Sequence, residues 1–189
     1  AALGTIIADL DDLASAEAAP LHAAPVSIDV GELVRGIAAA LDGQARTAGA
    51  TLVIEISPGL AAWADREHVR RALTNVVANG IRHGAGRPVE IRGGTSEEGE
   101  AVVRVTDHGP GIAAADLPHV FERFYRADRS RAADPATGQR SGSGLGLTIA
   151  RELLAANGGG IDVEATGPAG TTFVVRLPRS VTHSQVGPT

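Results

Sequence analysis

The 189-residue sequence contains no cysteine and no lysine, and only 3% of its residues are aromatic. Without cysteine the chain cannot form a disulfide, a thiolate nucleophile or a zinc–thiolate site. Without lysine it cannot contain the phosphate-binding loop of the GxxxxGK(S/T) type, in which the lysine reaches the outer phosphates of a nucleotide. Because aromatic side chains are so few, we expect a core built mainly from aliphatic residues.

Long apolar runs and an excess of positive charge are also missing. No window approaches the roughly 20 apolar residues of a membrane span, and the N-terminus lacks a basic segment followed by an apolar one. We therefore expect no membrane insertion by this chain. The formal net charge of −5 argues against a nucleic-acid binder that depends on a broadly cationic surface.

The length allows one main domain with an appendage. Apolar residues at three- and four-residue spacing predict a one-stripe helix over residues 1–19. Pro20 and Pro25 bracket a linker over residues 20–25. The compact domain is expected over residues 26–179, and residues 180–189 read as a loose tail.

Periodicity and capping residues predict the elements of this domain. We expect helices from Asp29 to about Gly49, from Asp65 to about His83, and over residues 145–156. Strands are expected over residues 51–56, 61–64, 89–92, 101–106, 161–164 and 171–177. The mixed order indicates an α/β fold, a two-layer sandwich with a mixed sheet of about five strands and three helices on one face.

A carboxylate follows the strand expected over residues 101–106. Asp107 opens the sequence Asp-His-Gly-Pro-Gly, in which Gly109 and Gly111 would let a flat ligand approach the backbone. The carboxylate of Asp107 can accept a hydrogen bond from the exocyclic amine of adenine, whereas guanine presents a carbonyl oxygen at that edge. Taken alone, the same residues are also typical of a turn that ends a strand.

A second glycine cluster opens the helix expected over residues 145–156. Gly142, Gly144 and Gly146 form a GxGxG pattern at its start, where unpaired N–H groups and the helix dipole favour an anion such as phosphate. The spacing differs from the dinucleotide fingerprint, and a polar loop precedes it in place of a buried strand. A flexible hinge is the simpler alternative. The preceding residues 126–143 carry almost no large apolar side chain and predict a long loop.

The helix from Asp65 to about His83 carries a polar cluster. Asn75 and Asn79 are four residues apart and point to one side, with Arg82 and His83 about one turn further on. An asparagine carbonyl oxygen suits Mg²⁺, and an arginine can meet phosphate charge. A solvated helix face is the alternative. Gly80 within this helix costs about 1 kcal/mol relative to alanine, which suggests close approach of another group.

These motifs occur together in a characteristic order. The asparagine pair is followed by DxGxG at Asp107–Gly111, the aromatic stretch Phe121–Arg126, GxGxGL at Gly142–Leu147 and the Gly170–Phe173 segment. The chain thereby resembles the histidine kinase branch of the gyrase, heat-shock chaperone, histidine kinase and mismatch-repair ATPase superfamily. The resemblance covers about residues 26–177 and implies the Bergerat-type ATP-binding fold, with ATP and Mg²⁺ as cofactors.

The resemblance also implies roles for individual residues. Asn79 would hold Mg²⁺, Asn75 would support the phosphates or the reaction geometry, and Asp107 would read adenine. His83 would lie beside the adenine ring, and residues 126–143 would form the ATP lid. Arg82, Arg123 and Arg126 are the candidates for phosphate contact. The other expected nucleotide contacts are Gly109, Gly111, Ile112, Tyr125, Gly142, Ser143, Gly144, Leu145, Gly146, Leu147 and Thr172. The family typically has alanine where this chain has Gly80.

One position distinguishes the branches of the superfamily. Its hydrolytic members carry a glutamate one helical turn before the metal-binding asparagine, where it activates water, and this chain has Asn75 there. An amide cannot act as a general base. The site should therefore hold ATP without hydrolysing it efficiently and keep the γ-phosphate for another acceptor.

The phosphoacceptor of a histidine kinase is missing from the sequence. It is a histidine normally followed by Glu or Asp in a helical hairpin, and none of the six histidines has such a neighbour. Residues 1–19 resemble the end of the second helix of that hairpin, although an N-terminal amphipathic helix is the simpler interpretation. The expected partners are the phosphoacceptor dimerisation domain of the same full-length kinase and a cognate response regulator, in the cytoplasmic portion of a membrane-anchored sensor.

Two other functions remain open from the sequence. A serine kinase of the anti-sigma-factor type shares the fold, but it would be expected to keep the glutamate that Asn75 replaces. A non-catalytic module that reports ATP binding to a partner would have the same nucleotide contacts. Only phosphate transfer to a supplied hairpin separates this module from a kinase.

Overall fold

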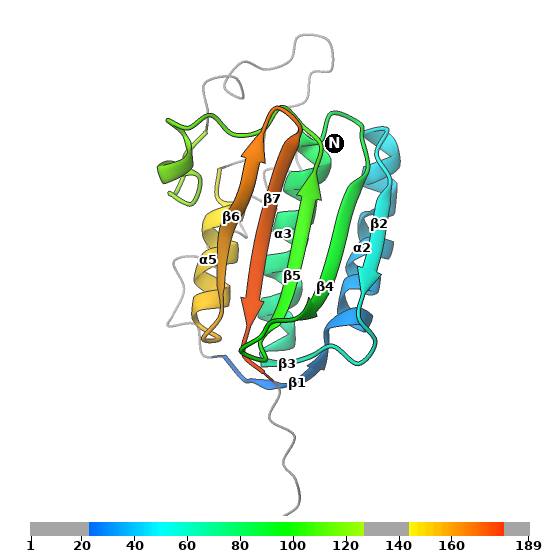
Figure 1. Cartoon of the computed structure of the whole chain (residues 1–189), viewed down its shortest axis with the longest axis vertical. Helices are drawn as coiled ribbons and strands as arrows, with labels where there is room; N and C mark the ends of the chain where they lie inside the picture. Colours follow the sequence, from blue (N-terminus) through cyan, green and yellow to red (C-terminus); the bar gives the residue numbers. More distant parts are fainter. Residues whose placement is uncertain (1–22, 127–143, 180–189) are drawn as a thin grey trace, which may run out of the picture.

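The computed structural model describes residues 23–126 and 144–179 (Figure 1). The predicted helix over residues 1–19, the tail from residue 180 and the loop from residue 127 to 143 lie outside these described residues. None of the described helices is long and apolar enough to cross a membrane.

A five-stranded mixed sheet forms one layer of the molecule. Its strands, in spatial order, are β2 (Leu52–Ile56), β4 (Val89–Thr95), β5 (Ala101–Asp107), β7 (Gly170–Leu177) and β6 (Gly160–Gly167). The β2–β4 pair is parallel and the other pairs are antiparallel. The predicted mixed sheet of five strands is confirmed, and β4 and β6 are longer than the sequence patterns indicated.

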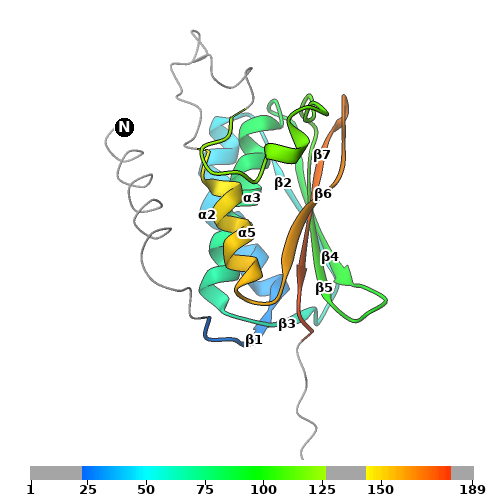
Figure 2. The same cartoon turned by 90° about the vertical axis from the view of Figure 1, so that its left-hand side faces the viewer.

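Three helices form the second layer and cover one face of the sheet (Figure 2). They are α2 (Val30–Thr47), α3 (Arg66–His83) and α5 (Gly146–Ala155). Both predicted caps are present: the Asp29 side chain accepts a hydrogen bond from the Glu32 N–H at 2.8 Å, and Asp65 accepts from the N–H groups of Glu67 and His68. The two-layer arrangement with three helices on one side is therefore confirmed.

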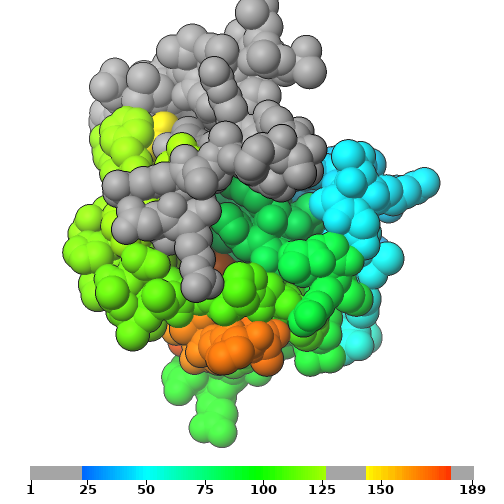
Figure 3. All heavy atoms as spheres, turned by 90° about the horizontal axis from the view of Figure 1, so that it is seen from above, coloured from blue at the N-terminus to red at the C-terminus, as the bar shows by residue number. Residues whose placement is uncertain are grey.

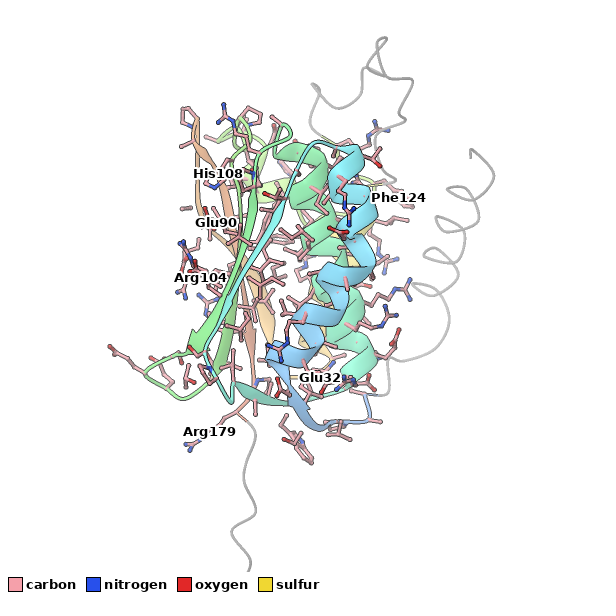
Figure 4. The ribbon with its side chains drawn as sticks, turned by 90° about the vertical axis from the view of Figure 1, so that its right-hand side faces the viewer. Glu32, Glu90, Arg104, His108, Phe124 and Arg179 are labelled. Carbon is pink, nitrogen blue, oxygen red and sulfur yellow. The ribbon has the colours of Figure 1, made fainter. Side chains whose placement is uncertain are left out.

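The core between the layers is aliphatic apart from Phe173, as the composition predicted. Leu73 of α3, Leu154 of α5 and Ile91 of β4 are almost completely buried there. The opposite face of the sheet carries ion pairs such as the one between Arg104 and Glu164 (Figure 4). Burial of a large apolar side chain contributes about 1.5–3 kcal/mol, so the helix-covered face supplies most of the stabilisation.

A two-stranded sheet lies at the lower end of the molecule in Figure 1. It pairs β1 (Val26–Asp29) with β3 (Ala61–Ala64), in antiparallel register. Strand β1 was not predicted from the sequence, because four residues between a proline linker and a helix cap carry little periodicity. This strand forms through its partner, which lies far away in the sequence.

Candidate functional site

Four chain segments that are distant in sequence meet at the upper end of the molecule. They are the end of α3, the end of β5 with the loop that follows it, the start of α5, and the β6–β7 turn (Figures 1 and 3). In Figure 3 the β6–β7 turn (orange) lies beside the segment after β5 (yellow-green), which in turn borders the green surface that includes the end of α3. Most of the sequence-predicted site residues lie on these segments.

Asp107 is the last residue of β5, and its carboxylate is buried at 4% exposure. Its Oδ1 accepts hydrogen bonds from the N–H of Gly109 at 2.9 Å and the N–H of Thr171 at 3.3 Å. Among the described residues none donates to Oδ2. Oδ2 therefore remains an acceptor suited to a ligand N–H group.

The loop after Asp107 contacts residues on both faces of the sheet. The His108 side chain turns to the sheet face opposite the helices, where its Nε2 lies 2.9 Å from Glu90 Oε1 (Figure 4). The His108 carbonyl oxygen accepts a hydrogen bond from Arg87. Gly109 packs so closely on the end of α3 that a Cβ there would overlap the carbonyl oxygen of His83. The glycine is therefore required for this backbone approach.

Asn75 faces the start of α5. A Cβ built on Gly146 would lie 3.7 Å from Cγ of Asn75, which places the amide beside the first turn of this helix. The Asn75 Nδ2 atom is buried and has no hydrogen-bond partner among residues 23–126 and 144–179. The residue before the helix, Leu145, provides no side-chain cap. The Asn75 side chain thus lies beside a helix N-terminus without a side-chain cap, and the backbone N–H groups of such a first turn can stabilise an anionic group.

Asn79 lies one turn further along α3 and is partly buried. Its side chain makes no hydrogen bond to the described residues, so its carbonyl oxygen is available as a ligand. The described residues contain no cluster of three His, Asp or Glu side chains that would bind a metal unaided. One amide oxygen fits Mg²⁺, which commonly takes one or two protein ligands and completes its shell with phosphate oxygens and water.

The glycine of α3 is closely packed, as the sequence suggested. A Cβ built on Gly80 would lie 3.1 Å from Cγ1 of Val89 and 3.8 Å from Cβ of Asp107. The former distance is tighter than ordinary van der Waals contact. Gly80 therefore lets α3 approach β4 and brings the helix against the strand that ends in Asp107.

His83 ends α3 beside the Asp107 loop. Its pKa is lowered, first by desolvation from the surrounding protein and then by the nearby Arg82 guanidinium, while Asp107 acts in the opposite direction. The residue is nevertheless exposed, so solvent screens these electrostatic interactions. A neutral imidazole at neutral pH is suited to stacking beside a flat aromatic base.

In the segment over residues 121–126, some side chains pack into the fold and others point into solvent. Phe121 packs edge-to-face on Phe173, with ring centroids 6.4 Å apart, whereas Phe124 is 60% exposed (Figure 4). Arg123 forms an ion pair with Glu152 of α5 at 2.9 Å. This cation, a candidate for phosphate contact, is thus engaged at the outer side of α5.

Tyr125 and the residues around it connect this segment to α5. The Tyr125 hydroxyl donates to Asp116 at 2.5 Å, and the N–H of Phe124 donates to the carbonyl oxygen of Gly144. Arg126 is partly buried and ends the described part of the segment. Gly142 and Ser143, both predicted nucleotide contacts, lie outside the described residues.

The apolar residues among the predicted nucleotide contacts pack in or against the hydrophobic core. Leu145 is 3% exposed and belongs to the core cluster, and Ile112 and Leu147 are partly buried against it. Their backbone, more than their side chains, borders the meeting point of the four segments. Gly111 has φ of +78° and packs against the carbonyl oxygen of Gly167 in the β6–β7 turn.

The two adjacent threonines of β7 point to opposite faces of the sheet. Thr171 is buried, pairs with Asp107 and donates its N–H to that carboxylate. Thr172 pairs with Thr106, and their hydroxyl oxygens lie 2.9 Å apart on the face away from the helices. Thr172, the residue predicted from the sequence, thus points away from Asp107, and Thr171 lies beside it. Side chains alternate between the two faces of a strand, so Thr171 lies on the same face as the core residue Phe173. This alternation could have identified Thr171 from the sequence.

Comparison with known proteins agrees with this arrangement. A sequence profile described as "Histidine kinase-, DNA gyrase B-, and HSP90-like ATPase" matches residues 64–181. The signal transduction histidine-protein kinase AfsQ2 of Streptomyces coelicolor is 39% identical over 126 residues, which cover 67% of this chain and 22% of that protein. The chain spans about a quarter of the length of the curated relatives that it matches.

Solved structures share the fold. Full-length ShkA in complex with AMPPNP superposes with a TM-score of 0.75 at 26% identity, over 93% of this chain and 35% of that one. The mycobacterial sensor histidine kinase MprB superposes with a TM-score of 0.68 at 27% identity, over 82% of this chain and all of that one.

Proposed function

The chain belongs to the histidine kinase-, DNA gyrase B- and HSP90-like ATPase family, and from this premise we propose that it binds Mg²⁺-ATP and transfers the γ-phosphate to a histidine. The acceptor is an imidazole nitrogen in a dimerisation hairpin outside this sequence. The phosphate then passes to an aspartate of a response regulator. In this proposal the chain works on the cytoplasmic side of a sensor, as the ATP-binding catalytic part of a larger kinase.

The observation that carries the proposal is the Asp107 carboxylate. Two backbone N–H groups fix Oδ1, while Oδ2 has no donor among the described residues. Such a fixed acceptor matches the exocyclic amine of adenine and opposes the carbonyl oxygen of guanine. His83, whose lowered pKa favours the neutral ring, lies next to this position on α3.

The phosphates would lie toward the start of α5. The unpartnered Nδ2 of Asn75 and the N–H groups of the first turn are donors for phosphate oxygens. Asn79, one turn along the same helix, would hold Mg²⁺ through its carbonyl oxygen. When bound, Mg²⁺ would neutralise phosphate charge, and the helix and amide donors would orient the γ-phosphate for in-line transfer.

The side chain at position 75 favours a kinase over a hydrolase. A hydrolytic enzyme needs a base that takes a proton from the attacking water, and an amide cannot do so. The side chain of Asn75 lies beside the first turn of α5, where its amide can hydrogen-bond but cannot take up a proton. Bound ATP would therefore persist until an acceptor histidine arrives. The relatives named as histidine kinases support the same choice.

Calorimetric titration with ATP and GTP, with and without Mg²⁺, tests the binding step. We expect ATP to bind selectively and to release phosphate slowly. In Asp107→Asn the amide presents a donor to the adenine amine, so ATP affinity should fall by about tenfold to a hundredfold. Equal affinity of the wild-type chain for ATP and GTP would contradict the role of Asp107, and rapid phosphate release would contradict the role of Asn75.

Addition of a phosphoacceptor hairpin from a histidine kinase tests the transfer step. Radiolabelled phosphate should appear on the histidine of the hairpin with the wild-type chain and should be absent with Asn79→Ala. Normal transfer by Asn79→Ala would refute the assignment of Asn79 to Mg²⁺. Tight ATP binding without transfer to any hairpin would favour the alternative of a non-catalytic module that reports nucleotide binding.

A further inference from the structure

Strand β6 contains an irregularity just before the β6–β7 turn. Its first half pairs Ile161 with Val175 and Val163 with Phe173, so both of these β6 residues face the helices. The register then shifts between Val163 and Ala165, which leaves Glu164 as an extra residue. This is a β-bulge, in which two residues of one strand oppose a single residue of its partner.

The bulge reverses the direction of the side chains that follow it. Strict alternation from Val163 would turn Thr166 to the outer face of the sheet, together with Glu164. With the bulge, Thr166 instead pairs with Thr171, whose side chain lies on the side of Asp107. Glu164 keeps its outward position and forms its ion pair with Arg104. The extra residue thus brings a hydroxyl group to the site.

The hydroxyl group of Thr166 joins the two ends of the Asp107 loop. Its Oγ1 accepts a hydrogen bond from the N–H of Ile112 at 2.8 Å and lies 3.0 Å from Oγ1 of Thr171. Thr171 in turn donates its N–H to Asp107. The start of the loop is therefore held through Thr171 and its end through Thr166, both on the β6–β7 hairpin.

We infer that Thr166 is a positioning residue for nucleotide binding, which holds the loop from Asp107 to Ile112 so that Oδ2 and the glycine backbone face the base. This inference rests on the proposed binding of ATP by the same site. Without the acceptor at position 166, the Ile112 N–H loses its partner and the end of the loop can move away from the hairpin. Such movement would displace Asp107, although the carboxylate itself is unchanged.

Thr166→Val and Thr166→Ser test the inference. Valine has the shape of threonine without the hydroxyl, so ATP affinity should fall by about tenfold and discrimination against GTP should fall with it. Serine retains Oγ and should restore both. Thr106→Val is a matched control, because it removes a similar threonine pair from the outer face of the same sheet. It should leave ATP affinity unchanged.

Amide hydrogen exchange of Ile112, followed by NMR, reports on the loop without any nucleotide. Exchange should be faster in Thr166→Val than in the wild-type chain or in Thr166→Ser. Wild-type ATP affinity in a folded Thr166→Val chain would overturn the inference and leave the proposed function standing. Failure of the wild-type chain to bind ATP would refute the proposed function and, with it, any role of Thr166 in nucleotide binding. A loss of affinity that serine does not restore would also overturn the inference.

Discussion

At the scale of single residues, His83 links the site to the pH of the solution. Its pKa lies below the ordinary value of 6.5, mainly through desolvation and secondarily through Arg82. Above that ordinary value the ring is neutral in both the folded and the unfolded chain. As the pH falls below it, the unfolded chain binds a proton that the folded chain does not. Acidification therefore destabilises the fold until the pH reaches the pKa of the folded state.

His83→Gln should remove this part of the acid sensitivity. Between about pH 7.5 and about pH 5, the free energy of unfolding should fall more in the wild-type chain than in the variant. Urea unfolding at a series of pH values measures the difference. The two chains should show the same trend above neutral pH, and an equal acid loss in both would mean that His83 does not contribute.

At the scale of elements, Asp65 connects three parts of the chain at the end opposite the site. Its Oδ1 caps α3, and its Oδ2 accepts the N–H of Ala24, just before β1, at 2.9 Å. The backbone N–H of Asp65 donates to Asn157, which follows α5. Desolvation raises the pKa of the Asp65 carboxyl group. The hydrogen bonds that it accepts from the backbone N–H groups of Ala24, His68 and Glu67 outweigh this effect, so the pKa lies below its usual value.

Asp65→Ala should destabilise the fold more than Asp29→Ala. Removal of an N-cap costs about 1 kcal/mol and up to about 2 kcal/mol. Asp29 accepts one backbone N–H, whereas Asp65 accepts three, so we expect the two substitutions to lie near the lower and upper values respectively. Chemical unfolding of both variants at neutral pH gives the comparison. A smaller loss for Asp65→Ala would show that the link to Ala24 adds nothing.

The lowered pKa of Asp65 also predicts how its contribution to the free energy of unfolding changes with pH. The carboxylate stabilises the fold above its unfolded pKa, and this contribution disappears as the pH falls through the lower pKa of the folded state. The destabilisation of Asp65→Ala relative to wild type should therefore shrink in acid. This dependence separates a charged cap from a purely steric effect.

At the scale of the whole molecule, the site exists only when the layers have assembled. Asp107 comes from β5, Asn75 from α3 and Gly146 from the start of α5, so no single element contains it. A ligand that contacts all three stabilises only the folded chain. Mg²⁺-ATP at about 100 times its Kd should add about 2.7 kcal/mol to the free energy of unfolding.

Thermal unfolding measures this linkage. For a domain of this size the added stability corresponds to a rise in Tm of roughly 5–10 °C. GTP at the same concentration should produce a much smaller rise, and the effect of ATP should weaken in Asn79→Ala. No change in Tm at any ATP concentration would contradict nucleotide binding by the folded chain.

The helices, most of the strands and the order of the family motifs could be predicted from the sequence alone. The caps at Asp29 and Asp65 and the apolar periodicities are local, so each can be identified within one element. The order of the asparagine pair and the two glycine clusters indicated the family for the same reason. Each motif depends on a few neighbouring residues, and their succession is read directly along the chain.

Which side chains meet depends on contacts between segments that are distant in the sequence. The bulge at Glu164 depends on the pairing of β6 with β7, and it turns Thr166 to the side of Asp107. The unpartnered amide of Asn75 is significant only because α5 starts beside it. Strand β1 likewise forms through pairing with β3. These features arise from contacts between distant segments, whose free energy depends on the packed fold and has no local pattern in the sequence.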